Sequence, residues 1–81
     1  MIEKQILLEN IDPSVFFGKN NDNIILIKNL FPKLKLTFRG STIKAIGEKE
    51  SIIFFEKKIK ELEKYCAQFN TLNENIIIDI V

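Results

Sequence analysis

The spacing of apolar residues changes twice along this chain, and that change restricts the fold more than any other feature of the sequence. Apolar residues fall at helical spacing in residues 24–31, alternate with polar residues in 34–47, and return to helical spacing in 52–69. A period near 3.6 residues is typical of an amphipathic helix, and a period of 2 is typical of a strand. In a chain of 81 residues, this succession predicts one small α+β domain with helices packed on a sheet.

The alternating segment, KLKLTFRGSTIKAIG, reads as a β-hairpin with a two-residue turn at Gly40-Ser41, of the type that has glycine first. Such a turn pairs residues across the hairpin on one apolar face: Phe38 with Ile43, Leu36 with Ala45, and Leu34 with Gly47. The other face carries the polar residues Lys35, Thr37, Arg39, Thr42 and Lys44. Because the apolar face must cover the core, these polar side chains are expected to point outward or to line a groove.

From Glu48 onward the helical period predicts a long amphipathic helix. Its apolar side carries residues at spacings of three and four: Ile52, Phe55, Ile59, Leu62, Cys66 and Phe69. A coiled-coil seam would show the same spacing, but this segment holds fewer than three heptads, which is short for one. We favour packing on the sheet. The opposite side mixes five lysines with five acidic residues between Glu48 and Lys64, which is typical of a solvated surface rather than a phosphate-binding one.

The N-terminal part shows the signals of a strand followed by a short helix. Residues 3–9 are apolar in the middle and are best read as the first strand. Asp12 is a suitable helix cap, and Pro13 stands at the first helical position, where proline is tolerated. Gly18 then ends this helix. A second helix starts soon after, at the beginning of the apolar run 24–31.

The bounds of the second helix complete the predicted order of elements. Asp22 or Asn23 can start this helix, and Pro32 stops it because proline cannot continue the helical hydrogen bonding. The chain therefore reads β-α-α-β-β-α, with a C-terminal segment still to be assigned. We expect an α+β fold with a three-stranded antiparallel sheet covered by helices.

The C-terminal segment, residues 72–81, carries two conflicting signals. Thr71 is followed three residues later by Glu74, a spacing that fits a capping box and favours a helix. The β-branched run Ile76–Ile78 favours a strand instead. We predict a C-terminal helix on the strength of the capping signal.

The net charge is +1, but positive charge is concentrated in the middle third of the chain. Residues 19–44 hold six cations against Asp22 alone, which is six minus one or +5, whereas residues 1–18 and residues 45–81 each sum to −2. A basic segment inside an otherwise balanced domain is typical of a surface that binds nucleic acid.

The sequence offers no group of residues suited to catalysis. Histidine is absent and Cys66 is the only cysteine, which removes histidine-activated nucleophiles and, in practice, zinc sites. The three glycines do not form a phosphate loop. Cys66 lies on the apolar side of the long helix, where it reads as a small buried hydrophobe. We therefore expect no catalytic residue, no bound cofactor and no metal in this chain.

Cysteine usage and hydropathy also predict where the protein resides. A single cysteine excludes an internal disulfide, in agreement with a reducing compartment. The longest apolar runs, such as Ile24–Ile27 and Ile76–Ile78, are far shorter than the roughly 20 residues that span a bilayer. The N-terminus does not read as a signal peptide. We expect a cytoplasmic protein that does not contact a membrane.

The predicted order of elements resembles a KH domain of the eukaryotic type. In that fold the loop between the first two helices reads G-x-x-G and clamps a single-stranded nucleic-acid backbone. The corresponding loop here reads Gly18-Lys19-Asn20-Asn21. Asn21 stands where the second glycine is expected, so the loop resembles a degenerate form of the clamp.

Two longer motifs give a closer resemblance. The stretch F-G-x-x-x-x-N-I begins at Phe17, and the hairpin reads R-G-x-x-I-K-x-x-G from Arg39 to Gly47. Their succession resembles the N-terminal domain of bacterial PhoH-like proteins, over nearly all of residues 5–75. That family resembles phosphate-starvation-inducible ATPases, with a KH-like domain, a following P-loop domain and a suspected part in RNA metabolism. The resemblance implies that residues 1–81 are a single KH-like domain excised from the N-terminal part of a longer protein. ATP and magnesium then belong to the missing domain, and no ATP-binding residue carries over.

The first functional hypothesis is an accessory domain that binds single-stranded RNA weakly and with little sequence preference. Its expected site is a degenerate KH groove formed by the loop and the outward face of the hairpin: Gly18, Lys19, Asn20, Asn21, Lys35, Arg39 and Lys44. The same loop residues are also the ordinary residues of a helix-capping turn. Both interpretations of the loop stay open at this level.

The second hypothesis is a protein-interaction or oligomerisation module that docks on the missing ATPase domain and positions it. Phe16, Phe17 and residues 76–81 would then be contact residues, because an exposed apolar segment tends to find a partner or another copy of the chain. The alternative is that Phe16 and Phe17 belong to the core, and we favour it because aromatic side chains are so often buried.

Overall fold

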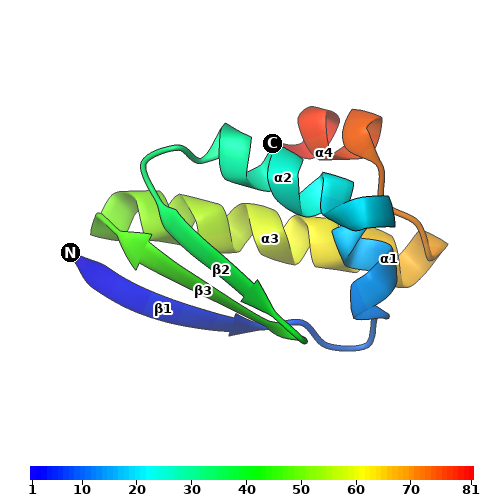
Figure 1. Ribbon diagram of the computed structural model, residues 1–81, viewed down its shortest axis with the longest axis horizontal. Helices are drawn as coiled ribbons and strands as arrows, with labels where there is room; N and C mark the ends of the chain where they lie inside the picture. Colours follow the sequence, from blue (N-terminus) through cyan, green and yellow to red (C-terminus); the bar gives the residue numbers. More distant parts are fainter.

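The computed structural model describes residues 1–81 and confirms the predicted fold class. A three-stranded antiparallel sheet, with strand order β1-β3-β2, has its helices on one face (Figure 1). Along the chain the elements are β1 (Ile2–Leu7), α1 (Pro13–Phe17), a 3₁₀ turn (Lys19–Asn21), α2 (Asp22–Leu30), β2 (Lys35–Arg39), β3 (Thr42–Gly47), α3 (Lys49–Phe69) and α4 (Glu74–Ile80). The order β-α-α-β-β-α with a C-terminal helix is the predicted one.

The hairpin has the predicted register on most of its length. Phe38 pairs with Ile43 and Leu36 with Ala45, so the turn is the expected Gly40-Ser41 pair. Gly40 has a φ of 58°, as a turn with glycine first requires. The third predicted pair does not form within the ladder because β2 begins after Leu34.

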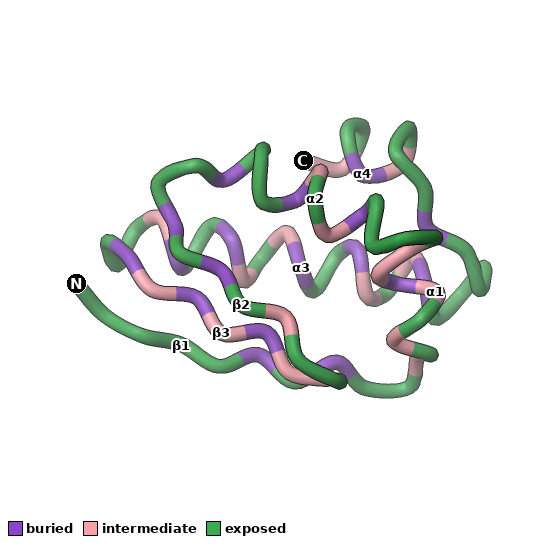
Figure 2. Tube along the Cα trace, in the orientation of Figure 1, coloured by how far each residue is buried: buried purple, intermediate pink, exposed green.

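The core lies between the sheet and α3. Buried positions alternate along β3 and recur every three or four residues along α3 (Figure 2). Five of the six predicted α3 residues are buried: Ile52, Phe55, Ile59, Leu62 and Cys66. Phe69 was wrongly placed in the core, since its side chain is 54% exposed. The helix ends there, Asn70 turns the chain in a left-handed conformation, and the Phe69 ring packs on Tyr65 at 4.6 Å between centroids.

The first short helix forms as its cap predicts. The Asp12 carboxylate accepts a hydrogen bond from the amide of Ser14 at 2.9 Å, and Gly18 ends α1 with a φ of 82°. Phe16 is fully buried, and Phe17 is partly buried against the core. The suggestion that Phe16 is a contact residue is therefore wrong, and the alternative of a core position holds.

The C-terminal segment is helical, as predicted, but with a different cap. Asn73 accepts a hydrogen bond from the amide of Ile76 at 3.1 Å and caps α4, whereas Thr71 makes no such bond. Ile77 is fully buried, and Ile78 is 51% exposed. The other apolar residues at this end pack partly against the core: Ile76, Ile80 and Val81. Residues 76–81 therefore pack on their own domain through Ile77 and its partly buried neighbours, while Ile78 and Asp79 are exposed.

Candidate nucleic-acid interface

The Gly18–Asn21 loop is a tight connection whose backbone demands these residue types. Gly18 has a φ of 82°, Asn20 of 55° and Asn21 of 62°. Such angles suit glycine, and among the other residues they suit asparagine better than most. The amide of Asn21 donates to the carbonyl of Gly18 at 3.1 Å. Three positive φ angles in four residues explain the local sequence without reference to a ligand.

A buried asparagine behind the loop holds three parts of the chain together. Asn23 is only 5% exposed. Its amide nitrogen donates to the carbonyl oxygen of Phe16 at 3.1 Å and to that of Leu72 at 2.9 Å. A methyl group at Gly18 would lie 2.8 Å from the Asn23 Cγ and Nδ2 atoms. Gly18 therefore has a packing role, since any side chain there would displace Asn23.

The role of Asn23 is hard to predict from the sequence. The sequence predicts Asn23 only as one of two residues that can start the second helix, because asparagine is common at helix caps. The actual cap residue of α2 is Asn21, and Asn23 lies inside the first turn of the helix. The one available signal was a polar residue next to the apolar run beginning at Ile24. Its partner at Leu72 is 49 residues away.

The loop borders an open hollow on the helical side of the molecule, which we call the loop hollow. It is lined by Gly18, Lys19, Asp22, Asn23, Ile25, Leu26, Asn29, Leu72, Asn73 and Glu74. Lys19 is exposed there, but the carboxylates of Asp22 and Glu74 line the same hollow. Their negative charge opposes the attraction that Lys19 alone would exert on a phosphate.

The outward face of the sheet carries a different hollow, which we call the sheet hollow. It has a volume of about 380 Å³ and is lined by Gln5, Thr37, Arg39, Thr42 and Lys44. No helix covers this face, because all the helices pack on the other side of the sheet (Figure 1). Lys35 shares the outward face of β2 but does not line the hollow.

The predicted site is therefore divided. Gly18 and Lys19 border the loop hollow, and Arg39 and Lys44 border the sheet hollow. Asn20 and Asn21 are exposed beside the first of these, in the loop itself, and line neither hollow. None of the three hollows of the molecule joins the loop to the outward face of the hairpin, as the single predicted groove would require.

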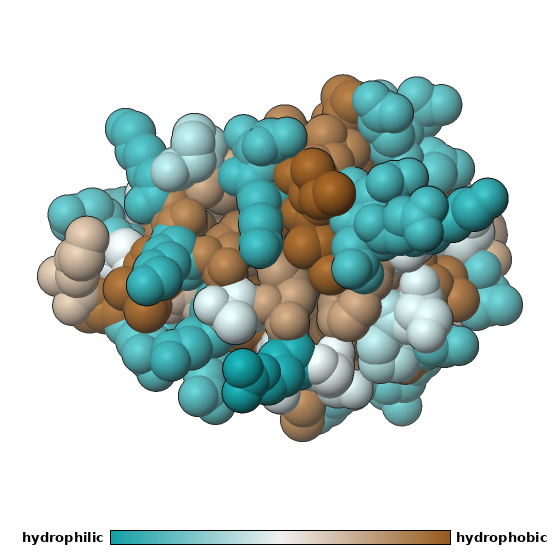
Figure 3. Space-filling model, in the orientation of Figure 1, coloured by the Kyte–Doolittle hydropathy of each residue, from teal (hydrophilic) through white to brown (hydrophobic).

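Two aromatic side chains, one from α1 and one from β2, pack together beside a lysine of α2. Phe17 and Phe38 meet edge to face, with ring centroids 5.9 Å apart. The ammonium group of Lys28 lies 6.0 Å from the Phe38 ring centroid, within reach of a cation–π interaction. We call these three residues the α2–β2 strip. Both phenylalanines are partly exposed, and hydrophobic surface runs across the middle of this side of the molecule with hydrophilic side chains around it (Figure 3).

Sequence reasoning missed two members of this strip. Phe38 was assigned to the core because it alternates with polar neighbours, and its ring does face inward, but β2 is the outer strand of the sheet and leaves one side of the ring accessible. Lys28 was counted only in the charge balance. An edge strand also has one backbone edge without a strand partner, which is available to a ligand.

The cations of the middle third are mostly free of acidic partners. The four ion pairs of the molecule join Lys4 to Glu56, Lys44 to Glu3, Lys58 to Glu61, and Lys60 to Glu63. The exposed cations without such a partner in residues 19–44 are Lys19, Lys28, Lys33, Lys35 and Arg39. Their charge is thus directed to solvent, where it can attract an anionic ligand.

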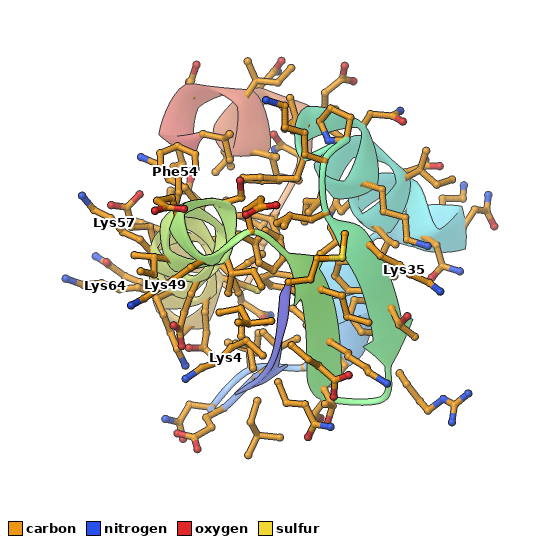
Figure 4. All side chains as sticks on the ribbon, turned by 90° about the vertical axis from the view of Figure 1, so that its left-hand side faces the viewer. Lys4, Lys35, Lys49, Phe54, Lys57 and Lys64 are labelled. Carbon is orange, nitrogen blue, oxygen red and sulfur yellow. The ribbon has the colours of Figure 1, made fainter.

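A separate set of lysines lies on the other side of the molecule. Lys49, Lys57 and Lys64 project from the outer side of α3, away from Lys35 on β2 (Figure 4). None of the three forms an ion pair. Acidic residues stand close to them in the helix sequence, as in Glu50 and Glu61, so this stripe is the solvated surface that the charge pattern predicts.

Cys66 has the character expected of a structural residue. Its side chain is 2% exposed. Burial raises the pKa of the Cys66 thiol, and the negative charges of Asp12 and Glu63 raise it further. A thiol held in its protonated form is a poor nucleophile.

Comparison of the chain with protein-family models, with curated proteins and with solved structures finds no match. No helix of the structure is both long enough and apolar enough to cross a membrane.

Proposed function

We propose that this chain is a non-catalytic domain that binds single-stranded RNA weakly and with little sequence preference. The observation that carries the proposal is the α2–β2 strip: two partly exposed aromatic rings in edge-to-face contact, with Lys28 over the Phe38 ring, beside the free edge of β2. Lys35 on β2 and Lys19 in the 3₁₀ turn are exposed and form no ion pair, so they add free positive charge nearby in the fold. The resemblance to the N-terminal domain of PhoH-like proteins supports the same function and a cytoplasmic location.

The chemistry of the strip accounts for both parts of this proposal. Nucleotide bases stack on aromatic side chains largely regardless of sequence, because every base has a π face. Lysines attract the phosphates without reading the bases. Phe17 and Phe38 meet edge to face and are only partly exposed, so they present less ring surface than a flat platform. Weak affinity follows from this limited stacking area.

The test compares two variants that remove the same amount of charge. Lys19, Lys28 and Lys35 are replaced by Ala in the first, and Lys49, Lys57 and Lys64 in the control, which lies on the opposite side (Figure 4). Binding of a fluorescent single-stranded RNA is measured by anisotropy over a salt series. We expect the first variant to bind more weakly, with a salt slope reduced by about 0.7 per lost phosphate contact, and the control to bind as the parent does.

Two outcomes would contradict this function. Equal losses in the two variants would show that binding depends on total charge and not on the α2–β2 strip. Absence of binding by the parent protein at low salt would remove RNA as a ligand.

Replacement of Phe38 by Leu keeps an apolar side chain and removes the ring, so it should weaken binding through lost stacking by about 1–3 kcal/mol.

The loop supplies a further check. Asn21 occupies the position of the second glycine of a KH clamp, and it is exposed. If the loop approaches the RNA backbone, Asn21→Gly should strengthen binding, because it removes the side chain at the point of approach. Unchanged affinity would leave the loop as a capping turn outside the binding surface.

A second candidate function, a protein-interaction module, is favoured by an apolar hollow between the end of α2 and the start of α3. It has a volume of about 380 Å³ and is lined by Leu30, Phe31, Pro32, Lys33, Leu34, Glu50, Ser51 and Phe54. Phe54 is 48% exposed although its ring packs on that of Phe31, with centroids 6.0 Å apart. An exposed aromatic side chain beside an apolar hollow is typical of a docking surface. This function predicts docking on a P-loop domain of the kind that PhoH-like proteins carry, or self-association, and no RNA binding. Sedimentation at high concentration with the parent and Phe54→Ala distinguishes it.

A further inference from the structure

The sheet hollow has a regular construction that the register of the strands defines. Lys44 on the central strand lies opposite Gln5 of β1 and Thr37 of β2. Arg39 lies opposite Thr42 in the neighbouring row. Directly opposite side chains in an antiparallel sheet stand about 5 Å apart, and all five point to the outward face because their neighbours in sequence, Ile6, Leu36, Phe38, Ile43 and Ala45, face the core.

Every side chain that lines the sheet hollow can donate hydrogen bonds. The guanidinium of Arg39 and the ammonium of Lys44 carry positive charge, and the hydroxyls of Thr37 and Thr42 and the amide of Gln5 are neutral donors. No apolar and no acidic residue lines the hollow. A concave set of donors with two positive charges is matched by an anion that has several acceptor oxygens.

The charges of the hollow are available to a ligand. Arg39 is exposed and forms no ion pair. Lys44 is 3.6 Å from a carboxylate oxygen of Glu3, and both side chains are about half exposed. An exposed pair of this kind contributes little and is readily exchanged for a better partner. Glu3 is the only carboxylate that pairs with a cation of this surface.

We propose that the sheet hollow is a binding site for a phosphate monoester. A monoester carries a charge of about −1.5 to −2 at pH 7 and has three strong acceptor oxygens, which suits two cations and three neutral donors. A diester within a nucleic-acid chain carries a single charge and leaves one cation unmatched. The planar guanidinium fork of Arg39 suits two oxygens of one phosphate. This site shares no residue with the α2–β2 strip and goes beyond the proposed function.

The experiment follows backbone amide signals in NMR spectra during three titrations: inorganic phosphate, uridine 5′-monophosphate and uridine. We expect saturable shifts centred on Thr37, Arg39, Thr42 and Lys44 with the two phosphates and none with uridine. If the nucleotide binds more tightly than inorganic phosphate, the esterified group also contacts the protein. If the two affinities are equal, the protein contacts the phosphate group alone. Shifts that do not saturate, or that spread over all lysines, would overturn the proposal.

Three substitutions define the site further. Arg39→Gln keeps a polar side chain and should weaken phosphate binding about tenfold, since a hydrogen bond to a charged group is lost. Glu3→Gln should strengthen it about threefold by releasing Lys44. Lys35→Ala, on the same strand and the same face but outside the hollow, should leave it unchanged. Equal effects of Arg39→Gln and Lys35→Ala would show attraction by surface charge only.

These outcomes separate the two proposals. Loss of RNA binding in the variant at Lys19, Lys28 and Lys35, with phosphate binding intact, would support both. Phosphate binding in a protein that does not bind RNA would support the sheet hollow alone. Spectra of each variant show whether the fold is retained, so that a loss of binding is not confused with unfolding.

Discussion

Gly18 and Gly40 both stand in tight turns with positive φ, yet the structure confines them in different ways. Gly18 has a φ of 82°, and a methyl group added there would lie 2.8 Å from Asn23 atoms. Gly40 has a φ of 58° and nothing within 4 Å of the same added group. The turn at Gly40 is therefore set by the backbone alone, while the turn at Gly18 is also set by a residue of the core.

This difference helps to explain why the loop has the sequence Gly18-Lys19-Asn20-Asn21. A glycine in a nucleic-acid clamp allows close approach of the ligand, whereas Gly18 here allows close approach of Asn23. The resemblance to a KH loop and the packing role coexist at this position, because the loop's inner side meets Asn23 and its outer side, with Lys19, meets solvent. Substitutions can break or sharpen the comparison, and they are given in order of expected effect.

The largest effect is expected from Asn23→Ala. The carbonyls of Phe16 and Leu72 lose their donor in a buried setting, and each such loss costs about 1–3 kcal/mol. The free energy of unfolding should fall by roughly 3–5 kcal/mol, measured by denaturant titration. Asn29→Ala, on the exposed side of the same helix, is the control and should change it by less than about 0.5 kcal/mol. Equal losses of stability in the two variants would show that the hydrogen bonds of Asn23 to Phe16 and Leu72 do not stabilise the fold.

Gly18→Ala should destabilise the domain by roughly 2–4 kcal/mol, because strain at positive φ and displacement of Asn23 add together. The double variant with Asn23→Ala sharpens this. Alanine at position 23 lacks the Cγ and Nδ2 atoms that the new methyl group would meet. The stability lost in the double variant should therefore be smaller, by about 1 kcal/mol, than the sum of the losses in the two single variants. Strict additivity would show that the cost at Gly18 comes from the backbone alone.

Gly40→Ala should cost only about 1–2 kcal/mol, which is the cost of a left-handed backbone for an L-residue. No neighbour has to move, since the added group meets nothing. Gly40→Val adds a β-branched side chain and should cost slightly more, up to about 3 kcal/mol. Thermal unfolding compares these variants with Gly18→Ala. If Gly40→Ala lost as much stability as Gly18→Ala, contact with Asn23 would not be what separates the two turns.

The smallest effect is expected from Asn21→Gly, which should change the free energy of unfolding by less than about 0.5 kcal/mol. Asn21 is exposed and already has a φ of 62°, an angle that glycine adopts without strain. The rate at which a thiol reagent modifies buried Cys66 reports opening of the domain and can detect such a small change. A large change would show that the Asn21 side chain has a contact role.

The elements of the fold were accessible from the sequence to different degrees. The hairpin register was predicted because alternation and a glycine turn specify it locally, and the buried side of α3 followed from its period. The end of α3 was not predicted, because Phe69 continues the apolar period of the helix but lies where the helix stops. The cap of α4 was assigned to Thr71 from its spacing, while Asn73 makes the hydrogen bond.

The candidate site was less accessible. Positive charge in residues 19–44 was visible as a sum, and the outward direction of Arg39 and Lys44 followed from strand alternation. Their separation from Lys19 was not visible, because it depends on which side of the sheet the helices cover. Phe38 was recognised as a strand residue facing inward, but only the strand order shows that it lies at an edge.

By itself, the sequence determined the helices, the strands and the faces that each would bury, because these depend on residues a few positions apart. The tertiary structure decided what those faces met. Asn23 joins carbonyls at Phe16 and at Leu72, and Gln5 completes a hollow with residues more than thirty positions away on β2 and β3. Contacts at such separations follow from the packing of whole elements, where hydrophobic burial selects the arrangement and polar groups take the positions that it leaves.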